Sequence, residues 1–70
     1  MKDAKISRVT RRSEGRVQYL SFTIAGALVR AMRYFITDDR TCPWLVATGA
    51  DKLPQNAIAR GQFLTSIFNA

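Results

Sequence analysis

Residues 5–24, KISRVTRRSEGRVQYLSFTI, constrain the fold more than any other part of the chain. Strand-forming residues lie on both sides of the Ser-Glu-Gly sequence at residues 13–15, which is the pattern of two antiparallel strands joined by a short turn. A three-residue hairpin loop needs one residue at positive φ, and Gly15 can adopt that backbone without steric cost. The sequence therefore predicts an N-terminal β-hairpin with its loop at residues 13–15.

The loop length determines which residues of the hairpin share a face, because side chains alternate along a strand. The predicted pairs are Ala4 with Ile24, Ile6 with Phe22, Arg8 with Leu20 and Thr10 with Gln18. The apolar residues of one face are then Ala4, Ile6, Leu20, Phe22 and Ile24. The opposite face carries Lys5, Ser7, Val9, Arg11, Val17, Tyr19, Ser21 and Thr23.

Positive charge is concentrated in this hairpin. The chain has a formal net charge of +6, and residues 1–16 hold six cations against two acids. An excess of positive charge concentrated in one part of the chain indicates the kind of partner that the protein binds, and it does not indicate the fold. Arginine and lysine neutralise phosphates, and an aromatic ring can stack on a base. The predicted contacts to nucleic acid or another partner are Arg8, Arg11, Arg12, Arg16, Tyr19, Arg30 and Arg33. The alternative for Tyr19 is a solvated strand face paired with Val9, and for Arg30 and Arg33 a solvated helix face.

Length and composition favour a single small domain over residues 1–70. A hydrophobic content of 47% argues against wholesale disorder. No apolar run reaches the roughly 18 residues that span a membrane, and the N-terminus lacks the apolar segment of a secretory signal. Cys42 is the single cysteine and can form no internal disulfide. We therefore expect a cytoplasmic location, in the protein's own cell or in a host cell, and no membrane partner.

Residues 25–36 fit a helical period. Their apolar members, Ala25, Leu28, Val29, Met32, Phe35 and Ile36, fall on one side of a helix. Arg30, Arg33 and Tyr34 fall on the other side, and Thr23 is a suitable N-cap. Strand formers at residues 34–37 weaken the last turn of this predicted helix.

The remaining residues predict a turn, a strand and a second helix. Residues 37–41 form the turn, and residues 44–48 form a short third strand that begins after Pro43 and ends at Gly49. Trp44 is expected in the core. The helix starts from Leu53, with an apolar stripe at Ala57, Gly61, Leu64 and Phe68.

Arg60, Phe63 and Ile67 lie off this stripe. An apolar pair at i, i+4 on an otherwise outer face predicts self-association as a homodimer. The alternative is that the small domain itself covers Phe63 and Ile67.

These segments predict an α+β fold. Its small antiparallel sheet consists of the N-terminal β-hairpin plus a short third strand, packed by two helices in the order ββαβα. The alternative has residues 28–36 as a strand in a small curled sheet, with the last helix packed across it.

The composition argues against an enzyme. The chain has no histidine, the commonest general base, and Cys42 has no partners for a zinc site. Asp38, Asp39 and Asp51 could hold a divalent cation, but adjacent acids in a turn are more typical of a solvated loop. No glycine-rich phosphate loop is present. We predict no catalytic residues, no metal and no cofactor.

The sequence thus predicts a small non-enzymatic basic binding module that contacts nucleic acid or a nucleoprotein complex through its arginine-rich β-hairpin. The alternative is an inhibitor or adaptor that binds an acidic surface of a host protein complex. Phages and other mobile elements encode small proteins of this kind, and anti-CRISPR proteins are comparable in size and style. This is an analogy and not a sequence match.

Overall fold

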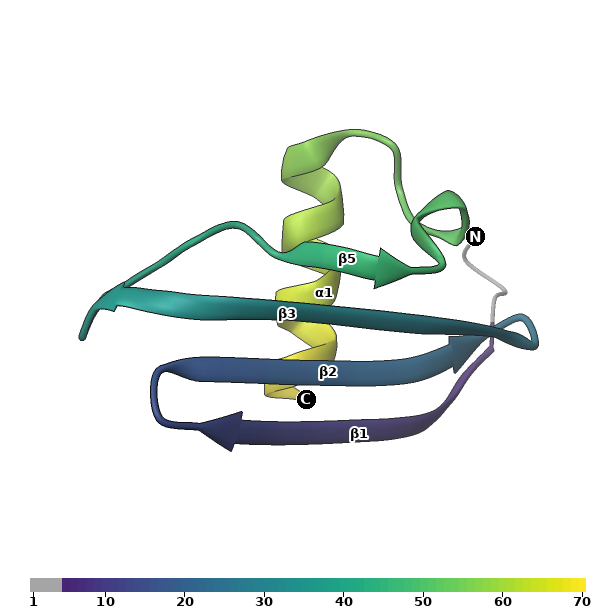
Figure 1. The fold of residues 1–70 in the computed structure, drawn as a ribbon. Helices are drawn as coiled ribbons and strands as arrows, with labels where there is room; N and C mark the ends of the chain where they lie inside the picture. The colour runs from purple at the N-terminus through teal and green to yellow at the C-terminus, as the bar shows by residue number, and fades with distance from the viewer. Residues whose placement is uncertain (1–4) are drawn as a thin grey trace.

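The structure is a computed structural model that describes residues 5–70. Its elements are β1 (Ile6–Glu14), β2 (Val17–Ile24), β3 (Ala27–Thr37), β4 (Arg40–Thr41), β5 (Leu45–Thr48), the 3-10 helix η1 (Ala50–Lys52) and α1 (Ala57–Asn69). The strands form one antiparallel sheet in which β1, β2 and β3 are neighbours and both β4 and β5 pair with β3. Helix α1 crosses one face of this sheet (Figure 1). Among the described residues, no helix has the length and apolar character needed to cross a bilayer.

The predicted order ββαβα is wrong, because residues 27–37 form β3 instead of a helix. Along β3 the buried residues Val29 and Ala31 alternate with exposed Leu28 and Arg30, which is the period of a strand. β3 pairs with the whole of β2, a long-range contact that overrides the local helical period. The alternative of a strand at residues 28–36 with the last helix across the sheet corresponds to the observed fold.

The N-terminal hairpin is confirmed, but its loop and register differ from the prediction. Glu14 pairs with Val17, so the turn has two residues instead of three. Gly15 has the expected positive φ, 59°, at the first turn position, which is the pattern of a type II′ hairpin. The second turn has positive φ at both Ala25 and Gly26, as a type I′ hairpin requires.

A β-bulge between Ser7 and Thr10 changes the register of β1 against β2. The observed pairs include Ile6 with Ile24, Thr10 with Ser21, Arg11 with Leu20, Arg12 with Tyr19 and Ser13 with Gln18. Arg8 lies inside the bulge with φ 56°. The two-residue turn moves Arg11 to the face of Leu20, and the bulge keeps Ile6 on the face of Ile24. The predicted pairs of Ile6, Arg8 and Thr10 are therefore wrong, and that of Ala4 lies outside the described residues.

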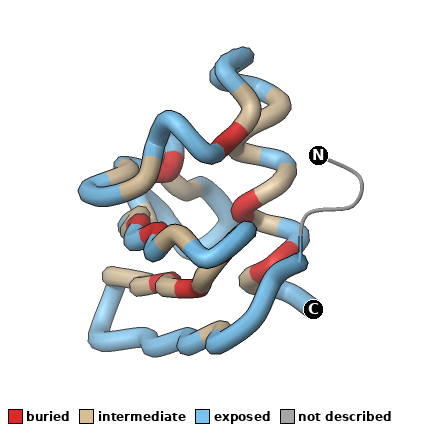
Figure 2. The backbone as a smooth tube through the Cα atoms, turned by 90° about the vertical axis from the view of Figure 1, so that its right-hand side faces the viewer, coloured by how far each residue is buried: buried red, intermediate tan, exposed pale blue. Residues whose placement is uncertain are grey.

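The core lies between the sheet and α1. Its buried residues are Leu20, Phe22, Ile24, Val29, Ala31, Trp44, Leu53, Leu64 and Ile67. Trp44 is buried, as predicted, and so is Cys42. Figure 2 shows buried segments on the strands and on the helix, whereas β1 is exposed along nearly its whole length.

Helix α1 begins later than the predicted start at Leu53. Asn56 is its N-cap, and the Asn56 side chain accepts hydrogen bonds from the N–H groups of Ile58 and Ala59. Leu53 precedes the helix and is buried in the core. The predicted third strand is confirmed as β5, which starts one residue later than expected.

Candidate functional site

The sheet has a covered face, packed on α1, and an opposite face, which we call the open face. The open face carries Ser7, Thr10, Arg12 and Glu14 of β1, Val17, Tyr19, Ser21 and Thr23 of β2, Leu28, Arg30, Met32 and Tyr34 of β3, and Leu45 and Thr48 of β5. No described helix or strand covers it (Figure 1). A sheet that is packed on one side only normally exposes polar residues on the other. This face instead mixes arginine, tyrosine and large apolar residues.

The strand register places three of the predicted contact residues close together. Arg12 is opposite Tyr19 on β2, and Ser21 next along that face is opposite Arg30 on β3. The Cζ atom of Arg12 lies 4.4 Å from the centroid of the Tyr19 ring. This distance is within the range of a cation–π contact.

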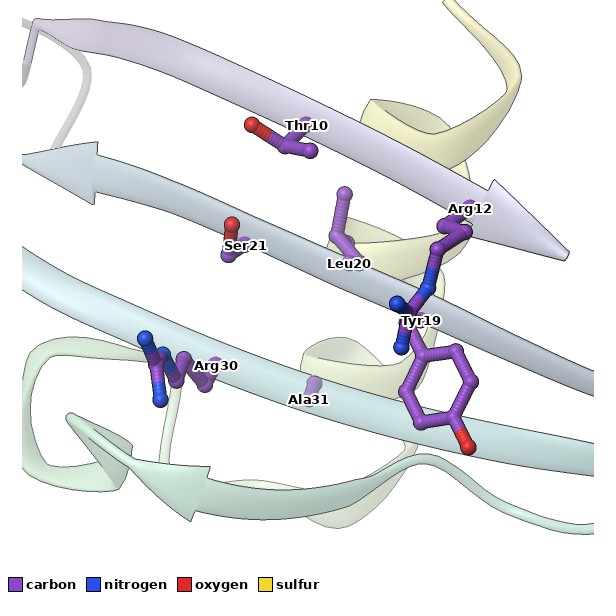
Figure 3. A pocket seen from close by; sticks show the side chains of 7 residues that line it. All are labelled: Thr10, Arg12, Tyr19, Leu20, Ser21, Arg30 and Ala31. Atoms are coloured by element: carbon purple, nitrogen blue, oxygen red, sulfur yellow. The ribbon is translucent and has the colours of Figure 1, made fainter.

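A shallow hollow of about 410 Å³ lies at this position. It is lined by Thr10, Arg12, Tyr19, Leu20, Ser21, Arg30 and Ala31. Figure 3 shows Arg12 reaching from β1 toward the Tyr19 ring and Arg30 on the other side of the group. The Thr10 and Ser21 side chains lie next to each other on β1 and β2, on the opposite side of Leu20 from the Tyr19 ring. The hollow thus combines guanidinium groups, one ring and two hydroxyls.

The acids near these cations bind them weakly. Arg12 Nη1 lies 3.4 Å from Glu14 Oε2, and the two side chains are 59% and 61% exposed. Arg16, at the hairpin turn, lies 3.6 Å from the fully exposed carboxylate of Asp38. Exposed pairs of this kind contribute only about 0–1 kcal/mol. Within residues 5–70, Arg30 has no acidic partner at salt-bridge distance. A stronger anion can therefore compete for all three guanidinium groups.

Two of the predicted contact residues lie on the covered face and bond within the protein. Arg11 donates from Nε and Nη2 to the backbone carbonyl of Ile67, at 3.2 and 3.0 Å. A cation near the last turn of a helix is favourable because of the helix dipole. Arg11 therefore joins the edge strand to the C-terminal turn of α1.

Arg33 is the second of these residues. It donates to Gln18 Oε1 at 2.8 Å and to Thr65 Oγ1 at 3.3 Å, and its Cζ lies 4.6 Å from the Trp44 ring centroid. Trp44 Nε1 also donates to Thr65 Oγ1. Burial lowers the pKa of the Arg33 guanidinium. Arg33 thus anchors the helix to the sheet.

Arg8 is exposed in the bulge of β1, away from the hollow, and Arg16 is exposed at the hairpin turn. The structure therefore brings Arg12, Tyr19 and Arg30 together and leaves Arg8 and Arg16 on the rim of the hairpin. Met32 and Leu45 are open-face residues that were not predicted from the sequence, whereas Tyr34 was placed beside Arg30 and Arg33. Alternation along β3 could have identified Met32 as a neighbour of Arg30.

The residues predicted for self-association have internal contacts. Ile67 is buried, and the Phe63 ring packs edge-to-face on Phe22 with the ring centroids 6.3 Å apart. Arg60 donates to the carbonyls of Pro54 and Gln55 in the loop before α1. The domain thus covers Ile67 and much of Phe63, whereas self-association itself stays a prediction.

The chain matches no protein-family model, and neither a curated protein nor a solved structure is significantly similar to it. Among residues 5–70, no group of three or more His, Cys, Asp or Glu residues is placed to hold a metal ion. A functional assignment therefore depends on the geometry and charge of the open face.

Proposed function

We propose that this chain is a non-enzymatic binding module that contacts nucleic acid, free or in a nucleoprotein complex, through the open face. The observation that carries the proposal is the register of Arg12, Tyr19 and Arg30 on three adjacent strands of an uncovered sheet face. Guanidinium groups bind phosphate, and an aromatic ring such as that of the half-buried Tyr19 stacks on a base. Both chemistries are needed by a nucleic-acid contact and both are supplied within one hollow.

The distribution of charge supports the proposal. Arg8 and Arg16 extend the positive surface of the hairpin on either side of Arg12, and the whole chain carries a net charge of +6. A basic surface attracts a polyanion over distances of about one Debye length, roughly 8–10 Å at physiological salt. In this arrangement Arg8 and Arg16 attract the ligand, and the hollow determines how it is held.

Exposed apolar residues favour a second candidate, an acidic surface of a host protein. Leu28 and Leu45 on the open face are 48% and 54% exposed. Apolar side chains beside arginine are common at protein interfaces. This alternative and the nucleic-acid proposal use the same face, and they differ in whether binding survives nuclease treatment.

The test measures the affinity of the full chain for a fluorescein-labelled 20-mer of mixed sequence, as single strand and as duplex, over a range of salt concentrations. We expect the affinity to fall with salt, because each phosphate contact releases counterions. Arg30→Glu should weaken binding and reduce the log–log salt slope by about 1. Lys52→Glu, the matched control, makes the same change in charge on η1, outside the open face.

Two results would contradict the proposal. The first is a flat salt plot, and the second is an equal loss in Arg30→Glu and Lys52→Glu, because either result removes the role of the open face. A protein partner recovered by pull-down after nuclease treatment, together with no affinity for the 20-mers, would favour the acidic protein instead.

A further inference from the structure

We infer that the nucleic acid is single-stranded and that one of its bases stacks on Tyr19 in the hollow. This inference rests on the proposed function and specifies its ligand. Three observations support it: the width of the open face, the chemistry of the hollow, and the weak contacts of Arg12 with Tyr19 and Glu14.

The open face is too wide for a duplex groove. Strands β1, β2, β3 and β5 lie side by side in the sheet. Neighbouring strands are about 4.8 Å apart, so four of them span roughly 14 Å before side chains are counted. The major groove is about 12 Å wide and admits a helix or a two-stranded ribbon. Tyr19 sits on β2, inside this face, where it cannot follow the hairpin edge into a groove.

The hollow presents groups that suit an unpaired base. In a duplex each base shows only its edges, whereas a single strand also offers its faces. Tyr19 supplies a ring for such a face, and the hydroxyls of Thr10 and Ser21 in the same hollow can hydrogen-bond to a neighbouring nucleotide of the strand. Arg30 borders the hollow on β3 and can bind an adjacent phosphate.

The Arg12 side chain can adopt a second position when a ligand binds. Its guanidinium now lies over the Tyr19 ring and 3.4 Å from Glu14. The Arg12 side chain is more than half exposed, so both contacts are weak. When a strand binds, Arg12 can turn to a phosphate and leave the ring to the base, or its own plane can take part in the stack.

The experiment compares the same labelled 20-mer as single strand and as duplex, in DNA and RNA, at one salt concentration. We expect the full-length protein to bind one or both single strands about tenfold or more tightly than the duplex. Tyr19→Leu removes the ring and should weaken single-strand binding roughly 5- to 100-fold, while duplex binding changes less than about twofold. Tyr19→Phe, the matched control, keeps the ring and should retain most of the affinity.

A second measurement needs no variant. Ultraviolet crosslinking of the unaltered protein to a single strand that contains 5-iodouracil, followed by trypsin, should label the peptide of residues 17–30, which contains Tyr19. Labelling of residues 61–70 on α1 in its place would overturn the inference.

The outcomes separate the two proposals. If the duplex binds at least as tightly as the single strands and Tyr19→Leu has no effect, the inference fails while the proposed function stands. If neither form binds, the proposed function fails. Thermal unfolding of Tyr19→Leu and Tyr19→Phe, followed by circular dichroism, verifies that both variants are folded.

Discussion

The two faces of the sheet use the same residue type in opposite ways. Arg30 and Arg33 are three residues apart on β3 and lie on opposite faces. Arg33, on the covered face, bonds to Gln18 and Thr65 and lies over Trp44. Arg30, on the open face, has no side-chain hydrogen bond or ion pair among residues 5–70. The comparison teaches that the face of the sheet, and not the charge alone, separates structural arginines from binding arginines.

The edge strand repeats this contrast with adjacent residues. The Arg11 side chain lies on the covered face and donates to the last turn of α1, whereas the Arg12 side chain lies on the open face and contacts the Tyr19 ring. If the contrast is correct, substitutions on the covered face should lower stability, and substitutions on the open face should lower binding with little change in stability.

The largest expected effect is on the core. Phe22 is fully buried on the covered face, and Phe22→Ala should cost about 3–5 kcal/mol. A domain of this size has about 3–5 kcal/mol to lose, so the variant should be largely unfolded. Leu28→Ala, the open-face control, should cost less than about 1 kcal/mol because Leu28 is already half exposed. Urea unfolding followed by Trp44 fluorescence measures both, and equal losses would contradict the division into two faces.

The arginine pair on β3 gives the next largest effect. Arg33→Met removes the bonds to Gln18 and Thr65 and the contact with Trp44, and should cost about 2 kcal/mol. Arg30→Met should change stability by less than about 0.5 kcal/mol. The same urea titration compares them. A loss of stability in Arg30→Met as large as in Arg33→Met would show that the open face is also structural.

Turn residues and the spacing of apolar residues predicted several elements of the fold correctly. The N-terminal hairpin with Gly15 at positive φ, the third strand, the buried Trp44 and the last helix all follow from turn residues and apolar spacing. β3 could not be predicted in this way, because its apolar residues fit a helical period, whereas in a strand they are mixed with arginine on both faces. Pairing with β2 along its full length decided between them.

The site was predicted in part, for the same reason. Arg12, Tyr19 and Arg30 were selected individually from charge and ring chemistry, but their proximity depends on the register of three strands. The pairing of Arg12 with Tyr19 depends on the hairpin turn, which has two residues instead of the predicted three. A change of one residue in loop length exchanges the faces of Arg11 and Arg12, so the sequence could not separate them.

The arginine pair on β1 gives a smaller effect on stability and a clear split in function. Arg11→Met loses two hydrogen bonds to the Ile67 carbonyl and should cost about 1 kcal/mol while nucleic-acid binding is kept. Arg12→Met should be as stable as the unaltered chain and bind single strands less tightly, with a salt slope lower by about 0.7. Thermal unfolding and fluorescence anisotropy measure the two properties. If Arg11→Met instead weakens binding and leaves stability unchanged, the distinction between a structural Arg11 and a binding Arg12 is wrong.

The smallest effect concerns the acid that competes for Arg12. Glu14→Gln removes the carboxylate 3.4 Å from Arg12, and should tighten single-strand binding about 2- to 5-fold at low salt because an exposed pair contributes at most about 1 kcal/mol. The gain should shrink as salt increases, because screening already weakens the pair. Asp51→Asn is the matched control, since Asp51 pairs with Lys52 at 3.7 Å outside the open face and loses the same charge. Anisotropy at two salt concentrations measures both variants. An equal gain in Asp51→Asn would attribute the effect to net charge and would remove Glu14 from any role in regulating Arg12.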